Sequence, residues 1–115
     1  MWMGREVRIF LKWQAKDAYL ELKKRDDKEA KAILSSFERV KEILKNNPQF
    51  GDPIKKELIP KKLRELGIQN LYRVELSNYW RIIYTIEGNR VEIFLFVLNI
   101  FDHNEYNKLF GYKKK

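Results

Sequence analysis

The chain has 115 residues, of which 44% are apolar and 35% are charged, and it contains no cysteine and a single histidine. The length predicts one domain over residues 1–115. The composition excludes disulfides, thiolate chemistry and a histidine-rich metal site. No segment approaches the roughly 18 apolar residues of a membrane span, and the first residues lack the apolar run of a signal peptide. We therefore expect a cytoplasmic protein that does not enter a membrane.

The net charge of +8 favours a polyanionic partner, which would be nucleic acid, the ribosome or an acidic protein. A surface of solvated lysines would explain the same charge without any partner. The charge is unevenly distributed: residues 26–47 carry five basic and five acidic side chains, whereas the segments 1–25, 48–69 and 70–115 are basic. A polyanion should therefore meet the first strand and helix, the segment before the sheet, or the C-terminal tail.

Alternation of apolar side chains predicts a first strand over about 6–13. Apolar residues at helical spacing then predict a short helix over 15–22 and a longer helix over 30–44, each with one buried stripe. Asp26 or Asp27 is placed to cap the second helix and to stabilise its N-terminus by charge.

The stretch 49–68 is the least regular part of the chain, and Pro60–Leu66 is expected to form a turn or two of helix within it. Its basic side chains make this segment a flap in front of the sheet; they are Lys61, Lys62 and Arg64. Near the C-terminus, Asp102 is a suitable N-cap for a closing helix over 102–110.

Three apolar runs, 71–76, 80–86 and 91–98, are rich in β-branched and aromatic residues and are separated by short turn sequences. This pattern is typical of consecutive hairpins. We therefore predict an α+β fold in which an antiparallel sheet of about four strands packs on an N-terminal helical hairpin, with a short C-terminal helix. The first strand should join the sheet edge or lie beside the last strand.

Charged residues interrupt this apolar meander at Arg73, Glu75 and Arg81. Because side chains alternate along a strand, a three-residue turn at 77–79 would set Glu75 opposite Arg81 and leave all three charges on one face. A shifted register would send Arg81 towards the helices, where burial of its charge is costly. Two interpretations stay open: a cross-strand ion pair that only stabilises the sheet, and guanidinium groups that bind a phosphate.

The single histidine, His103, follows the meander at the start of the closing helix. It is either an ordinary surface residue or, beside arginines and Tyr106, a group that transfers protons to or from a ribose hydroxyl and a leaving oxygen. Several aromatic residues could stack on bases or pack in the core: Tyr79, Trp80, Tyr106, Phe110 and Tyr112. The sequence has no phosphate-cradling glycine loop, paired metal carboxylates or nucleophile triad, so we expect neither a metal nor a cofactor.

Three segments carry a resemblance to a known family: Asn70-Leu71-Tyr72-Arg73-Val74, Tyr79-Trp80-Arg81-Ile82-Ile83-Tyr84 and Asp102-His103-Asn104-Glu105-Tyr106. With the order of elements, they resemble the RelE/ParE superfamily of type II toxin-antitoxin toxins over nearly the whole chain. The resemblance implies a small basic toxin of RelE-like fold that cuts messenger RNA in the ribosomal decoding site without a metal. Its partners would be mRNA, the ribosome and a cognate antitoxin protein that holds it inactive.

In the scheme that this resemblance implies, the 2′-hydroxyl of RNA attacks the adjacent phosphate while basic side chains stabilise the charged transition state. The expected catalytic residues are Arg81, His103 as acid or base, and Tyr106, which positions the RNA. The expected RNA-binding residues are Arg73, Lys61, Lys62 and Arg64. Glu75 departs from the family pattern, because RelE-like enzymes tend to have a second basic residue there.

Two other functions stay open. The ParE-like branch of the superfamily targets DNA gyrase, so the chain is alternatively a noncatalytic module of the same fold that inhibits gyrase or binds a protein or RNA. A basic scaffold domain with an ion-paired sheet is the third interpretation. Replacing His103 separates them, because an RNase would lose cleavage, a binding module would keep its effect on growth, and a scaffold would have no such effect.

Overall fold

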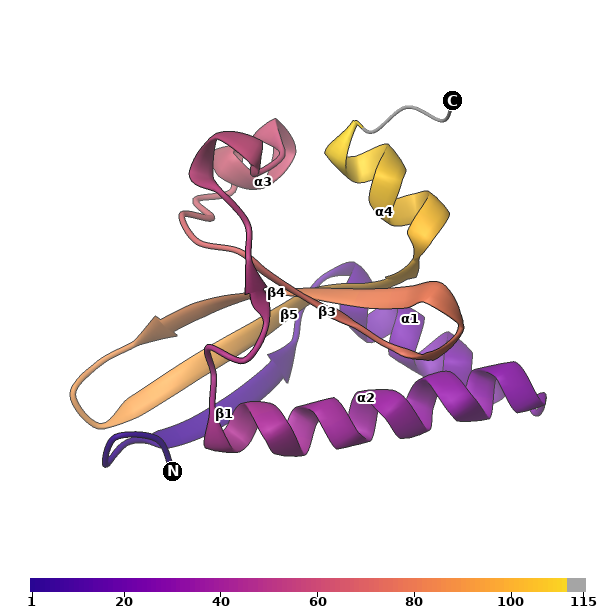
Figure 1. Ribbon diagram of the computed structural model, residues 1–115, viewed down its shortest axis with the longest axis horizontal. Helices are drawn as coiled ribbons and strands as arrows, with labels where there is room; N and C mark the ends of the chain where they lie inside the picture. Colours follow the sequence, from indigo (N-terminus) through magenta and orange to yellow (C-terminus); the bar gives the residue numbers. More distant parts are fainter. Residues whose placement is uncertain (112–115) are drawn as a thin grey trace.

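In the computed structural model, which describes residues 1–111, the chain forms an α+β fold with five strands, four α-helices and two short 3₁₀ turns (Figure 1). The strands are β1 (Glu6–Leu11), β2 (Asp52–Pro53), β3 (Tyr72–Glu75), β4 (Trp80–Gly88) and β5 (Glu92–Asp102). The helices are α1 (Gln14–Lys24), α2 (Lys28–Asn46), α3 (Lys61–Glu65) and α4 (His103–Phe110), and the 3₁₀ turns are η1 (Lys56–Leu58) and η2 (Ser77–Tyr79). No helix among these residues is long and apolar enough to cross a membrane. The sequence predicts base stacking or core packing for Tyr112 and contact between the C-terminal tail and a polyanion. Residues 112–115 lie outside the described residues.

The strands form one sheet in the order β1-β5-β4-β3-β2. The prediction of about four antiparallel strands on an N-terminal helical hairpin is wrong in two respects. β1 pairs with β5 in parallel, so the sheet is mixed and the helical hairpin follows an edge strand of the sheet. β2 adds a short fifth strand beside β3, at the other edge, where Pro53 is tolerated because an edge strand need not donate every backbone N–H. The first strand was expected at the sheet edge or beside the last strand, and β1 satisfies both alternatives, because it forms one edge and pairs with β5.

Helices α1 and α2 cover one face of the sheet, and α3 and α4 stand on the other face (Figure 1). The carboxylate of Asp27 caps α2 by accepting the backbone N–H of Ala30 at 3.2 Å. The main core joins the apolar stripe of α2 to alternate residues of the strands. The stripe includes Ile33, Phe37 and Val40, and the strand residues include Val74, Ile82 and Leu95. A smaller core joins α3 and α4 to the opposite face through Leu63, Leu71, Ile83, Leu98, Phe101 and Tyr106.

Strand β5 is longer than the predicted 91–98, and this extension determines where the histidine lies. Pairing continues to Asp102, with Phe101 opposite Arg81, after a bulge between the two halves of the β4–β5 ladder. A bulge lets two paired segments continue with a shifted register, which simple alternation does not reveal. As predicted, Asp102 caps α4, because its carboxylate accepts the backbone N–H of Glu105 at 2.9 Å. His103 is therefore fixed beside the start of β4.

A buried tyrosine ties the loop after α2 to the sheet. The Tyr84 hydroxyl donates to the carbonyl of Pro48 at 2.7 Å and accepts the N–H of Gly51 at 3.0 Å. A Cβ atom on Gly51 would lie 2.8 Å from the same hydroxyl oxygen, so the close approach requires glycine. Burial raises the pKa of Tyr84 to about 12. This anchor brings Asp52 beside β3.

Replacing Tyr84 with phenylalanine should destabilise the protein at neutral pH and reduce its sensitivity to alkali. The Pro48 carbonyl and Gly51 N–H lose this buried partner, which costs roughly 1–3 kcal/mol of unfolding free energy. The pKa of Tyr84 rises on folding from 10.0 to about 12. The wild type therefore loses stability, on the order of 2 kcal/mol, as the pH rises through this range. Denaturant titrations at neutral and alkaline pH measure both effects, and an equal alkaline loss in the two proteins would contradict this role.

Candidate functional site

The charged residues of the meander lie on the sheet face that α1 and α2 leave uncovered. Glu75 pairs with Arg81 across β3 and β4, and Arg73 pairs with Ile83, which is the register predicted from a turn at Ser77–Tyr79. Arg73 and Arg81 are therefore diagonal neighbours on one face, and such neighbours lie roughly 7–8 Å apart. The predicted placement of all three charges on this face is confirmed.

Both guanidinium groups lie over the ring of Tyr106 from α4. The Cζ atom of Arg81 is 4.6 Å and that of Arg73 5.7 Å from the ring centroid, and Arg73 Nη1 lies 3.5 Å from the Tyr106 hydroxyl. Tyr106 is only 2% exposed and stacks on Phe110 at 4.4 Å. A cation over an aromatic face is attracted by the ring quadrupole. The Tyr106 ring therefore attracts both guanidinium groups and holds two like charges close together on one face of the sheet.

Two exposed carboxylates lie beside the two arginines but leave part of each guanidinium group accessible to solvent. Arg81 Nη2 lies 3.8 Å from Glu75, and Arg73 Nη2 lies 3.6 Å from Asp52. The arginine side chains are 20% and 31% exposed, against 68% for Glu75 and 75% for Asp52. Long pairs with solvated carboxylates contribute little, and both guanidinium groups keep part of their surface exposed. Both guanidinium groups therefore keep donors for another anion.

The environment of Arg73 keeps its guanidinium charged. Burial lowers the pKa of Arg73, but the contact with the Tyr106 hydroxyl and the charge of Asp52 outweigh it, so the pKa is raised above its ordinary value. Sequence reasoning missed the contribution of Asp52, because nothing in the stretch 49–53 signals a strand that pairs with β3.

His103 lies at the N-terminus of α4 and is half-buried. Its ring contacts Tyr79 edge to face, with 5.7 Å between the centroids. Its Nδ1 atom is buried and has no hydrogen-bond partner in the described part of the chain.

The turn between β3 and β4 presents Tyr79, one of the aromatic residues for which the sequence left base stacking and core packing open. Asn78 and Tyr79 both have left-handed backbones, with φ of 60° and 61°, and the Tyr79 side chain is 78% exposed. This conformation costs an L-residue roughly 1–2 kcal/mol. Asn78 is a recognised signal for it, whereas a tyrosine is not. Tyr79 lines a hollow of about 390 Å³ together with Arg81 and Glu75.

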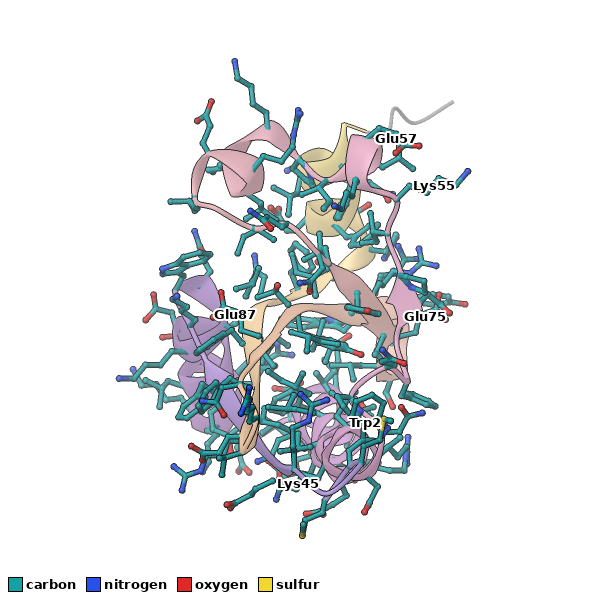
Figure 2. The ribbon with its side chains drawn as sticks, turned by 90° about the vertical axis from the view of Figure 1, so that its left-hand side faces the viewer. Trp2, Lys45, Lys55, Glu57, Glu75 and Glu87 are labelled. Atoms are coloured by element: carbon teal, nitrogen blue, oxygen red, sulfur yellow. The ribbon has the colours of Figure 1, made fainter. Side chains whose placement is uncertain are left out.

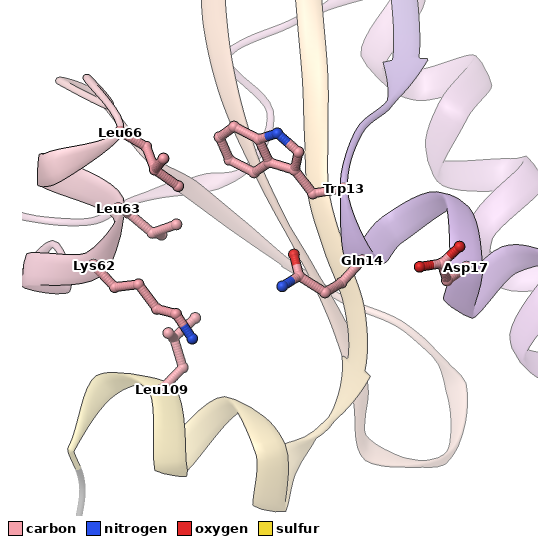
Figure 3. A pocket seen from close by; sticks show the side chains of 7 residues that line it. All are labelled: Trp13, Gln14, Asp17, Lys62, Leu63, Leu66 and Leu109. Atoms are coloured by element: carbon pink, nitrogen blue, oxygen red, sulfur yellow. The ribbon is translucent and has the colours of Figure 1, made fainter.

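The predicted basic flap does not border this hollow. Lys62 lines an apolar hollow of about 470 Å³ beside the start of α1. The apolar side chains around it are Trp13, Leu63, Leu66 and Leu109 (Figure 3). Lys61 and Lys62 also line a hollow of about 610 Å³ with Lys108 of α4, and Arg64 is exposed on α3. The RNA-binding role of these three flap residues stays a prediction.

Within residues 1–111, no three or more His, Asp or Glu side chains gather as a metal site would require. The uncovered face instead combines two partly exposed guanidinium groups, an imidazole and an exposed aromatic ring. Guanidinium forks match the geometry of phosphate oxygens. These groups are suited to bind a phosphodiester and to donate a proton to it.

Tyr106 should matter through its ring. Tyr106→Ala would remove a buried aromatic side chain from beneath two cations, so we expect a loss of about 3 kcal/mol in unfolding free energy. Tyr106→Phe retains the ring and should retain most of that stability. Thermal or urea denaturation of both variants measures the difference, and equal losses would mean that the hydroxyl, instead of the ring, supports the arginines.

The sequence was also compared with protein-family models and with curated proteins. No family model and no curated protein matches the chain. Its function therefore has to be inferred from the residues and the geometry described above.

Proposed function

We propose that this chain is a RelE-like toxin of a type II toxin-antitoxin system that cuts messenger RNA on the ribosome in the cytoplasm. One observation supports this proposal above the others. Two guanidinium groups from neighbouring strands lie over one buried tyrosine ring, at 4.6 and 5.7 Å from its centroid, on the face of the sheet that α1 and α2 leave open. Such an arrangement can hold a single phosphodiester with several donors.

In the proposed reaction, the 2′-oxygen of the ribose attacks the adjacent phosphorus and gives its proton to the neutral imidazole of His103 or to a water molecule, and the bond from phosphorus to the 5′-oxygen breaks. The products are a 2′,3′-cyclic phosphate and a 5′-hydroxyl. Arg73 and Arg81 stabilise the additional charge on the phosphate oxygens in the transition state. His103 acts as the acid or as the base of this reaction: its imidazolium gives the leaving 5′-oxygen a proton, or its neutral ring takes the proton of the 2′-hydroxyl.

Tyr106 contributes to this scheme indirectly, through its buried ring beneath the two arginines. With 2% of its surface exposed, it positions the RNA through the two arginines that it supports. The flap residues Lys61, Lys62 and Arg64 would contact more distant phosphates, because sequence-independent affinity for RNA comes from such charges. An antitoxin that covers this face of the sheet would block the arginines and hold the toxin inactive.

Glu75 supports a second candidate, a noncatalytic module of the same fold that inhibits gyrase or binds a protein or RNA. Its carboxylate lies 3.8 Å from Arg81 and would repel a phosphate at the same place. The carboxylate is exposed, however, and an exposed ion pair is weak and screened by salt. A bound RNA could displace it, so the nuclease remains our preferred function.

Arg81→Ala should lower mRNA cleavage by on the order of 10²–10³-fold while leaving the fold intact. Arg81→Lys should also be impaired, because an ammonium group cannot make the two parallel hydrogen bonds of a guanidinium fork. Mapping of transcript ends in a translation extract measures cleavage, and circular dichroism checks the fold. His103→Ala should abolish most cleavage, and His103→Gln should do the same, because an amide can form a hydrogen bond but cannot transfer a proton near neutral pH. Undiminished growth inhibition by Arg81→Ala and His103→Ala would favour the binding module.

Glu75→Gln should increase affinity for RNA by roughly two- to tenfold at low salt, because it removes a negative charge beside the phosphate site. Glu87→Gln is the matched control. It makes the same change in net charge on the same sheet face, and Figure 2 shows the two residues well apart. Fluorescence anisotropy with a labelled RNA over a salt series measures both variants. An equal gain in both would mean that only the total charge matters and that no phosphate lies beside Glu75.

A further inference from the structure

Tyr79 is the most exposed of the large apolar side chains in residues 1–111, and neither its backbone nor its burial explains its presence. Its φ of 61° is one that glycine or asparagine adopts at lower cost. With 78% of its surface exposed, the ring contributes little to the core. A residue that is held in an unfavourable conformation without a gain from packing is a candidate for a functional contact.

The turn that carries this ring is firmly anchored. The N–H of Leu76 donates to the carbonyl of Trp80 at 2.8 Å, which closes the hairpin across the turn. The N–H of Ser77 donates to the hydroxyl of Ser36 at 3.1 Å, and that buried hydroxyl donates in turn to the carbonyl of Ile33 in α2 at 2.8 Å. The base of the turn is therefore tied to the main core, and the ring is presented in a fixed place.

The ring also lies beside two groups of the proposed site. It contacts His103 edge to face, at 5.7 Å between the centroids and an angle of 63°. Tyr79 also lines the hollow of about 390 Å³ that Arg81 and Glu75 share. A phosphate at Arg81 would therefore place its neighbouring nucleotide beside an exposed aromatic ring.

We propose that Tyr79 is a stacking platform for the unpaired nucleobase next to the phosphate that Arg81 binds. This inference rests on the proposed function and names the form of its substrate, a single-stranded RNA whose base is unstacked at that position. Every base has a π-face, so the platform contributes affinity and register with little preference for sequence. A base within a duplex could not reach it, because it would remain stacked and paired.

The test uses a fluorescent single-stranded oligonucleotide of 2′-O-methyl RNA, in which the 2′-oxygen cannot attack. One abasic nucleotide is introduced at each position in turn, and affinity is measured by anisotropy. In the wild type, a single abasic position should lower affinity by about tenfold, in keeping with the usual contribution of one stacked base. Tyr79→Gly should lower affinity for the intact oligonucleotide by a similar factor and lose nothing further at that abasic position. Tyr79→Phe should bind as the wild type does.

Asn78→Gly is the matched control, since it also places a glycine at a positive φ of this turn but leaves the tyrosine ring. It should bind RNA as the wild type does. If Tyr79→Gly and Asn78→Gly weaken binding equally, or if Tyr79→Gly remains sensitive to every abasic position, the ring acts only through the shape of the turn and the platform is wrong.

Arg81→Ala separates this inference from the function on which it rests. If Arg81→Ala weakens binding and Tyr79→Gly does not, the phosphate site stands and the platform is wrong. If Arg81→Ala has no effect, or if the wild type does not bind the oligonucleotide, the phosphate site itself is wrong and the platform falls with it.

Discussion

The site depends on how one buried aromatic ring supports two like charges. Arg73 and Arg81 would repel each other as diagonal neighbours on the same sheet face, and the face of Tyr106 offsets part of that repulsion. Asp52 and Glu75 lie at the rim, where water weakens their pull on the guanidinium groups. The balance leaves two cations that are fixed in direction and not neutralised. In the function that we propose, a phosphate supplies further negative charge to both guanidinium groups.

The two faces of the sheet have different roles: one packs in the main core, and the other carries the charged site. On one face, α1 and α2 bury the alternate apolar residues of the strands in the main core. On the other, α3 and α4 form a smaller core that ends at the arginines. Charged side chains can occupy this face because they keep some exposure to water and contact the ring of Tyr106, whereas full burial of an unpaired charge is costly. The same division explains why the buried hydroxyls of Tyr84 and Ser36 matter, since they tie site-bearing loops to the rigid side.

His103 and Tyr79 add an imidazole and an exposed aromatic ring to the site that the two arginines form. The imidazole lies where β5 ends and α4 begins, and it contacts an aromatic ring that the β3–β4 turn holds out to solvent. The group that transfers protons, the base platform and the phosphate ligands would then lie together around a bound strand of RNA. The exposed carboxylates of Glu75 and Asp52 are the groups beside the arginines that oppose a phosphate.

The sequence by itself determined the local features: the meander, the place of Arg73, Glu75 and Arg81 on one face, the cap at Asp102, and a cap at Asp26 or Asp27, of which the structure uses Asp27. These follow from alternation, turn length and capping, which act between residues close in the chain. Only the tertiary structure decided the parallel pairing of β1 with β5, the edge strand β2, the extension of β5 beyond its bulge and the burial of Tyr106 under both arginines. Each of these joins segments that are distant in sequence, and no periodicity or spacing within one segment specifies its partner in another.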